Sequence, residues 1–314
     1  MGYEILLYVL AGFAALVLLI GFGLALVVTL IVTHPVKKAR PGYQEIKELN
    51  IKLGHVDYDA YDQMEKEIFK LPSSGAEINC VLIPASEPPC PGRPAKCLIT
   101  AHGFGLNLMT SVRYISVFRE MGYAVLIYDQ RSFGESSGTC SLGYFERQDM
   151  AALAAWARRR LGEDTIIGLH GESLGAITTL EALGLVEDVA FAVSDSGPTS
   201  FYAIYRAGTH LPVFPFLSAL NQWAKLRYGV DVREVRPIDK VAETEVPILF
   251  IHGTLDKPIP YRESEKLFAA AKNPLSRLEL FEGVWHTGAH MLEPERYERV
   301  VREFVRAAEE VRGV

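Results

Sequence analysis

The stretch TIIGLHGESLGAITTLEALGL, residues 165–185, joins a buried-strand pattern to a helix pattern across one tight turn. Its first half is apolar and β-branched and ends in glycine, and its second half reads as a helix that begins at Ser173. A serine between glycines at such a turn can be an exposed nucleophile. An N-capping serine at an ordinary strand–helix turn is the alternative. The choice between the two depends on the surrounding chain.

Strand and helix patterns alternate along most of the chain. We expect strands at 67–71, 77–83, 96–103, 123–129, 165–171, 189–195, 246–253 and 277–283, and helices at 108–121, 144–161, 173–185, 261–272 and 293–311. The first two strands are expected to form an antiparallel pair. Continuous apolar strands between helices predict an α/β fold, with a mostly parallel eight-stranded sheet and helices on both faces. Ligands of such sheets bind at the carboxyl ends of the strands.

The polar groups at these strand ends provide what a nucleophilic serine needs. A serine hydroxyl requires a base, and the base requires an orienting acid. Asp256 follows the seventh expected strand in GTLDKPIP, and His286 follows the eighth in EGVWHTGAH. When the nucleophile lies on such a strand–helix turn, the nucleophile, the acid and the base follow one another along the chain in the order Ser, Asp, His. The sequence therefore predicts Ser173 as nucleophile, His286 as base and Asp256 as acid.

Other polar residues near these positions offer alternatives. His290 is the alternative base and Asp195 the alternative acid. His102 ends the third strand, where we expect it to hold the loop HGFG in place. Glu172 is expected to help fix the turn and to transfer no proton.

An acyl-transfer site must also stabilise an oxyanion. The expected donors are the backbone N–H of Leu174, directly after the nucleophile, and one from the loop after the third strand. Phe104 of HGFG (102–105) is the predicted second donor.

The first 34 residues have the composition of a membrane span. Residues 5–32 contain no charge and no proline, and about 20 apolar residues suffice to cross a bilayer. A signal peptide would have a basic start and a shorter apolar core. The basic residues Lys37, Lys38 and Arg40 follow the span, which predicts a cytoplasmic catalytic domain on a single-pass protein of the cell membrane. Gly21 and Gly23 lack the GxxxG spacing, so no dimerisation motif and no oligomeric state is predicted.

We expect a linker over residues 35–61 and the catalytic domain over residues 62–314. The net charge is −6 and no basic stripe is present, which argues against nucleic acid as a partner. No metal site or cofactor is predicted, because the four cysteines lack CxxC spacing and histidine partners. Free thiols are favoured over a disulfide of Cys80 with Cys90 or Cys97.

HGFG, DQRSFGESSG (129–138), GESLGA, HGTLDKPIP (252–260) and the late histidine together resemble the α/β-hydrolase superfamily over about residues 62–312. The chain looks most like bacterial membrane-anchored hydrolases related to the S9-type, prolyl-oligopeptidase-like serine hydrolases. Ser132 stands where that pattern usually has glycine. The resemblance implies a serine esterase or lipase-type hydrolase with an acyl-enzyme intermediate. Dehalogenases and epoxide hydrolases of this fold use an aspartate nucleophile, unlike Ser173.

A segment rich in aromatic residues, about 196–241, is expected to form a small cap over the site. Within it Phe214, Phe216 and Leu217 are candidates to line an acyl pocket, or to pack the cap onto the core. A membrane span beside an apolar cap favours a lipid-like acyl ester as the small-molecule substrate. A thioesterase, a small-peptide hydrolase, and a membrane-tethered binding module without catalysis are the alternatives.

Overall fold

The computed structural model describes residues 2–33, 41–53, 56, 58–209 and 217–313. At its centre lies an eight-stranded sheet with the order β1-β2-β4-β3-β5-β6-β7-β8. The strands are β1 (Glu67–Ser73), β2 (Ala76–Ile83), β3 (Lys96–Ala101), β4 (Tyr123–Tyr128), β5 (Ile166–Glu172), β6 (Val189–Asp195), β7 (Ile248–Gly253) and β8 (Arg277–Phe281). β2 runs antiparallel to both β1 and β4, and the remaining neighbours are parallel. The predicted mostly parallel sheet is confirmed, and the antiparallel strands at one edge make it mixed.

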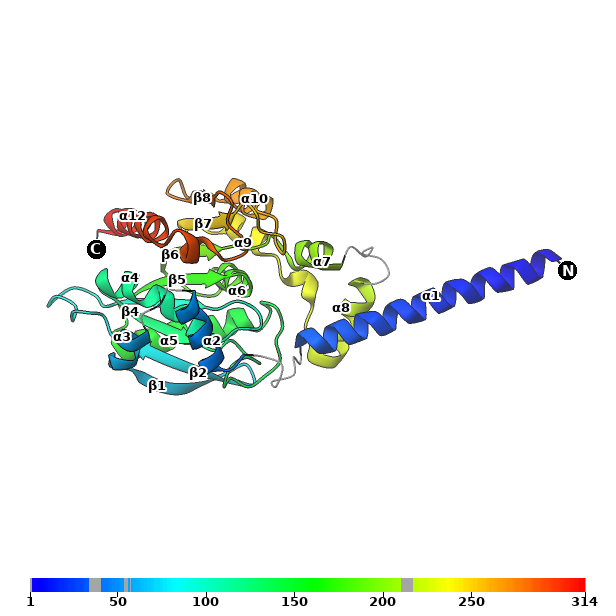
Figure 1. Cartoon of the computed structure of the whole chain (residues 1–314), viewed down its shortest axis with the longest axis horizontal. Helices are drawn as coiled ribbons and strands as arrows, with labels where there is room; N and C mark the ends of the chain where they lie inside the picture. Colours follow the sequence, from blue (N-terminus) through cyan, green and yellow to red (C-terminus); the bar gives the residue numbers. More distant parts are fainter. Residues whose placement is uncertain (1, 34–40, 54–55, 57, 210–216, 314) are drawn as a thin grey trace.

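Helices cover both faces of the sheet (Figure 1). On one face lie α2 (Tyr43–Lys52), α3 (Tyr58–Gln63), the 3-10 helix η2 (Leu108–Tyr114), α4 (Ile115–Glu120) and α12 (Pro294–Arg312). On the other lie α5 (Glu146–Leu161), α6 (Leu174–Ala182), α9 (Pro237–Glu243) and α10 (Arg262–Ala270). Side chains of a strand alternate between the two cores, as Val81 and Ile83 do against Cys80 and Leu82. This two-sided burial explains the continuous apolar strands.

Two segments differ from the sequence expectation. The helix expected at 108–121 is a 3-10 helix followed by the short α4. The linker expected over 35–61 carries α2 and α3, whose Ile46, Tyr58 and Tyr61 are buried in the core. Tyr43 of α2 also donates a hydrogen bond to Asp129, which follows β4. These helices therefore pack on the domain that they precede.

The segment between β6 and β7 covers the start of α6. It contains α7 (Phe201–Thr209), α8 (Ser218–Tyr228) and the 3-10 helix η4 (Val232–Glu234). Its buried side chains form a third apolar cluster with Leu174 and Ile177 of α6. The predicted small cap thus rests on the helix that begins after Ser173.

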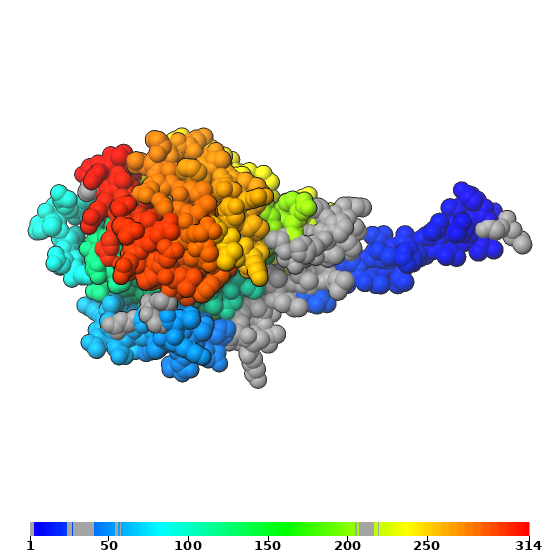
Figure 2. All heavy atoms as spheres, turned by 45° about the horizontal axis from the view of Figure 1, so that its top comes forward, coloured from blue at the N-terminus to red at the C-terminus, as the bar shows by residue number. Residues whose placement is uncertain are grey.

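The helix α1 (Gly2–Thr33) projects away from the rest of the molecule (Figures 1 and 2). Its C-terminal part approaches α8. Within it, the 21 residues Tyr3–Gly23 are long and apolar enough to cross a membrane, and their large side chains are exposed. The chain therefore has an N-terminal apolar helix of membrane-spanning length, a property that a signal sequence shares.

Candidate active site

Ser173 lies on a strained turn between β5 and α6. Its backbone has φ +55° and ψ −113°, a conformation that non-glycine residues rarely adopt and that costs about 1–3 kcal/mol. The turn is held by the Ser173 N–H, which donates to the Asp195 carbonyl oxygen at 2.9 Å. A Cβ on Gly171 would lie 2.1 Å from the Gly175 oxygen, and one on Gly175 would lie 2.0 Å from the Ala101 oxygen. Both glycines are therefore required by close backbone contact.

Two loops at neighbouring strand ends bring partners to this serine. The Ser173 Oγ lies 2.9 Å from the His286 Nε2, and the His286 Nδ1 lies 2.6 Å from the Asp256 Oδ2. A carboxylate accepts only, so the proton belongs on Nδ1 and the Nε2 lone pair faces the serine hydroxyl. The structure thus brings together the three residues predicted from the sequence, in hydrogen-bonded order.

The charge state of Asp256 suits an orienting acid. Burial raises the pKa of this carboxyl, but hydrogen bonds from His252, from His286 and from the Ile259 N–H outweigh that effect and hold the pKa below its usual value. The carboxylate is therefore ionised at neutral pH beside the imidazole.

The alternative residues have other neighbours. His290 is buried in α11 (Ala289–Leu292), with its ring against Tyr114 and Tyr297. Asp195 supports the turn through its backbone carbonyl, and its buried carboxyl accepts from Ser196 Oγ; burial raises its pKa to about 6. The geometry therefore favours His286 and Asp256 over these two residues.

The loop after β3 approaches the serine closely. A Cβ built on Gly103 would lie 3.6 Å from the Ser173 Cβ, so the backbone that continues into Phe104 passes close to the serine. Leu174 is the first residue of α6. Neither the Phe104 nor the Leu174 amide donates to a carbonyl oxygen in the turns, loops and caps that the structure describes. Both amides can therefore serve a substrate oxygen.

Hydrogen bonds of His102 and Gln130 fix this loop. His102 bonds the Gly103 oxygen through Nδ1 at 2.7 Å and accepts the Gln130 N–H at Nε2, as expected of a loop-holding residue. The Gln130 amide donates to the His102 oxygen at 2.5 Å and accepts from Thr178 Oγ1 of α6 at 2.7 Å. Gln130 therefore links the loop after β3 to the helix that carries the serine.

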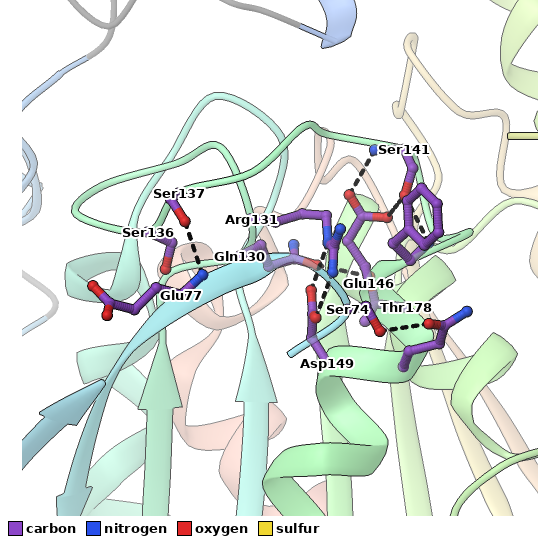
Figure 3. A network of polar contacts seen from close by, with 12 residues as sticks. Ser74, Glu77, Gln130, Arg131, Ser136, Ser137, Ser141, Glu146, Asp149 and Thr178 are labelled. Carbon is purple, nitrogen blue, oxygen red and sulfur yellow. Dashed lines mark hydrogen bonds and ion pairs between the residues drawn. The ribbon is translucent and has the colours of Figure 1, made fainter. Parts of the chain in front are cut away.

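The loop containing Gln130 is itself anchored on α5. The Arg131 guanidinium donates twice to Asp149, at 2.7 and 2.6 Å, and both side chains are buried (Figure 3). Glu146 accepts from the Ser141 and Gly143 backbone N–H groups, each at 2.8 Å. These contacts give the loop after β4 a fixed shape.

Behind the serine lies a buried ion pair that the sequence did not indicate. Glu172 accepts from the Arg113 guanidinium and from the Tyr114 hydroxyl, the latter at 2.8 Å. Arg113 and Glu172 are both buried, and they are 59 residues apart in the chain. The pair ties the turn to η2, which extends the expected turn-fixing role of Glu172. Only the apolar surroundings of an isolated arginine in LMTSVRY (108–114) could have signalled it.

The proposed pocket residues are only partly described. Phe214 and Phe216 lie outside the described residues. Leu217 is buried in the cluster that contains Leu174, so it packs the cap onto α6. Cys80, Cys90, Cys97 and Cys140, all within the described residues, form no disulfide. Within the described residues, no group of three His, Cys, Asp or Glu side chains is arranged to hold a metal ion.

The chain is similar in sequence to known proteins. A model of the X-Pro dipeptidyl-peptidase (S15) family matches residues 56–227. The chain is 32% identical to the uncharacterized protein YqkD of Bacillus subtilis over 263 residues, which are 80% of this chain and 83% of YqkD.

Solved structures share the fold at lower identity. The Pyrococcus furiosus esterase Pf2001 aligns with a TM-score of 0.61 and 22% identity, over 78% of this chain and 93% of the esterase. A Pyrococcus horikoshii acylaminoacyl peptidase aligns with a TM-score of 0.57 and 16% identity, over 81% of this chain and 44% of the peptidase. Both likenesses support the α/β-hydrolase fold.

Proposed function

The chain belongs to the X-Pro dipeptidyl-peptidase (S15) family of serine hydrolases, and we propose that it cleaves carboxylic esters through an acyl-enzyme on Ser173. One observation carries the proposal: the hydrogen-bonded series Asp256, His286, Ser173 ends on a strained turn whose glycines cannot be replaced. A serine that only caps a helix does not need a histidine and a carboxylate as partners.

The chemistry uses these residues in two stages. Ser173 Oγ attacks the ester carbonyl carbon while His286 Nε2 takes the hydroxyl proton, and Asp256 stabilises the imidazolium that forms. The tetrahedral oxyanion accepts hydrogen bonds from the Phe104 and Leu174 amides, each worth about 10²–10³ in rate. Collapse expels the alcohol, which takes the proton from His286. A water molecule then attacks the carbonyl carbon of the acyl-enzyme while His286 Nε2 takes its proton. Collapse of this second tetrahedral intermediate releases the acid, and Ser173 Oγ takes the proton back from His286.

We further propose that α1 anchors the protein in the cell membrane with the catalytic domain in the cytoplasm. The apolar stretch Tyr3–Gly23 of α1, in which Glu4 is the one charged residue, and the basic residues Lys37, Lys38 and Arg40 after α1 support this arrangement. The latter lie outside the described residues. In Figure 1 α7, α8 and α1 lie on one side of the sheet, beyond the end of β6 from which α7 follows. With α1 in a bilayer, this arrangement would place the substrate site on the membrane side of the domain.

The residues around the site favour a lipid-like acyl ester. Leu255 and Trp285 directly precede Asp256 and His286, and their side chains are 60% and 48% exposed. Phe104 is also exposed, with its ring 5.3 Å from that of Phe133. Exposed apolar residues that precede Asp256 and His286 or belong to the oxyanion loop suit a hydrocarbon chain, because burying them against it removes apolar surface from water.

A second candidate, the hydrolysis of a small peptide, is favoured by the S15 family match. The two are separated by assaying the full chain in non-ionic detergent against p-nitrophenyl esters of two to sixteen carbons and against X-Pro dipeptide p-nitroanilides. We expect kcat/KM to rise with chain length and to exceed that of the anilides. Cleavage of acetate alone contradicts the lipid-like substrate, and a higher kcat/KM for the anilides establishes the peptidase instead.

A further inference from the structure

A second histidine contacts the carboxyl group of Asp256. His252, near the end of β7, is fully buried, and its Nε2 lies 3.0 Å from the Asp256 Oδ2 and 2.9 Å from the Ile259 oxygen. Its Nδ1 lies 2.7 Å from the Ser264 Oγ of α10. The same carboxylate oxygen thus meets two imidazoles, those of His252 and His286.

The neighbours of His252 determine where its proton lies. Nε2 faces a carboxylate and a carbonyl oxygen, which only accept, so Nε2 carries hydrogen. Nδ1 is then free to accept the Ser264 hydroxyl proton. The ring donates through Nε2, and its orientation is fixed from both ends. The charged or titratable groups near it are Asp256 and His286 in the two loops and Asp195 at the end of β6.

His252 completes the set of donors to Asp256. Oδ2 accepts from His252 and His286, and Oδ1 accepts the Ile259 N–H at 2.8 Å. With three donors the carboxylate is held in one rotamer, with one Oδ2 lone pair directed at the His286 Nδ1. Without His252 this carboxylate can rotate about its last side-chain torsion. His286 is then the remaining side-chain donor to Oδ2, so the negative charge of Oδ2 holds the His286 proton more strongly.

We propose that His252 is a positioning residue that fixes Asp256 and limits how strongly it holds the proton of His286. The inference rests on the proposed function, because it assigns a role within the same site. Sequence reasoning missed His252, although its position four residues before Asp256 in HGTLD was the available signal.

A purely structural histidine would behave differently, and the chain contains one for comparison. His170 of β5 is fully buried and bonds Thr100 Oγ1 and the Tyr297 hydroxyl, each at 2.9 Å. It resembles His252 in burial and in having two side-chain partners, but it does not contact Asp256. His170→Gln is therefore the matched control.

The test compares His252→Phe, His252→Gln, Ser264→Ala and His170→Gln in the full chain in detergent. It measures kcat, KM and the pH profile of kcat/KM on a p-nitrophenyl ester, with the thermal midpoint as a check of folding. For His252→Phe we expect kcat to fall about 10- to 100-fold, as for loss of a hydrogen bond to a charged group, with KM within about twofold. The acid limb should move to higher pH, because the His286–Asp256 pair holds its proton more tightly.

The remaining variants separate positioning from packing. The amide of His252→Gln can donate from the place of Nε2, so it should restore the acid limb and most of kcat. Ser264→Ala should change kcat less than about threefold, since Asp256 and Ile259 still fix the tautomer. His170→Gln should lower the thermal midpoint and keep the wild-type pH profile.

A folded His252→Phe with wild-type kcat and acid limb would overturn the inference. If His252→Phe does not fold, His252→Asn, whose amide is too short to reach Asp256, replaces it, and an unchanged acid limb there has the same meaning. A wild-type protein that hydrolyses no ester instead refutes the proposed function, so the two failures are distinguishable.

Discussion

Removing the charge of Glu172 should destabilise the protein strongly, because it leaves the Arg113 guanidinium buried without an anion. Both side chains are buried, and burial opposes the charge of Arg113 while Glu172 sustains it, so that the pKa of Arg113 is raised. Breaking such a pair costs about 3–5 kcal/mol. At roughly 2 °C per kcal/mol for a chain of this size, Glu172→Gln should lower the Tm by about 6–10 °C.

The assay is urea unfolding of the full chain in non-ionic detergent, followed by tryptophan fluorescence. The control is Glu243→Gln, which removes an exposed ion pair with Lys240 and should cost no more than about 0.5 kcal/mol. Adding Arg113→Met to Glu172→Gln should recover most of the loss, since no unpaired charge remains. The reasoning is refuted if Glu172→Gln costs less than about 1 kcal/mol, or if the double variant loses the sum of the two single losses.

Three further predictions concern Gly175, Gln130 and His170. Gly175→Ala places a Cβ 2.0 Å from the Ala101 oxygen, so it should lower both the Tm and ester hydrolysis, the latter more than about 100-fold; near-wild-type hydrolysis would show that the turn can widen. Gln130→Leu leaves the His102 oxygen without the Gln130 amide as donor, while Thr178 Oγ1 keeps the Leu174 oxygen as acceptor, and it should cost about 2 kcal/mol in urea unfolding, whereas a loss below about 1 kcal/mol would contradict the link. Burial lowers the pKa of His170 to about 3, so the unfolded chain binds the extra proton between about pH 6.5 and 3. Stability is therefore lost as the pH falls through that window, by up to about 5 kcal/mol, and His170→Gln should have a flatter stability profile over it; an equal slope in both proteins would contradict this assignment.

The sequence was informative where local pattern and chain order determine the outcome. The glycines around Ser173 fix the turn by backbone contact, and strand ends of a parallel sheet meet at one edge, so Asp256 and His286 could be located from their positions after two strands. The sheet was predictable for the same reason, because two-sided burial leaves a continuous apolar pattern in each strand.

The contacts that could not be predicted join residues far apart in the chain. Arg113 lies in a 3-10 helix where the sequence pattern predicted a regular helix, and only tertiary packing brings it to Glu172. Tyr43 and Ile46 lie in a polar stretch that reads as a linker, yet the first bonds Asp129 and the second is buried. Side chains of such isolated residues give no periodic signal.

The central claim, that Ser173 is the nucleophile activated by His286 and Asp256, is tested most directly by stoichiometric labelling with a fluorophosphonate. Intact mass and peptide mapping of the full chain should show one adduct, on Ser173. Labelling should be absent in Ser173→Ala and slower by about 10³–10⁴ in His286→Gln or Asp256→Asn, as for loss of a triad member. An unlabelled wild type, an adduct on another residue, or equal labelling of Ser173→Ala would contradict the account.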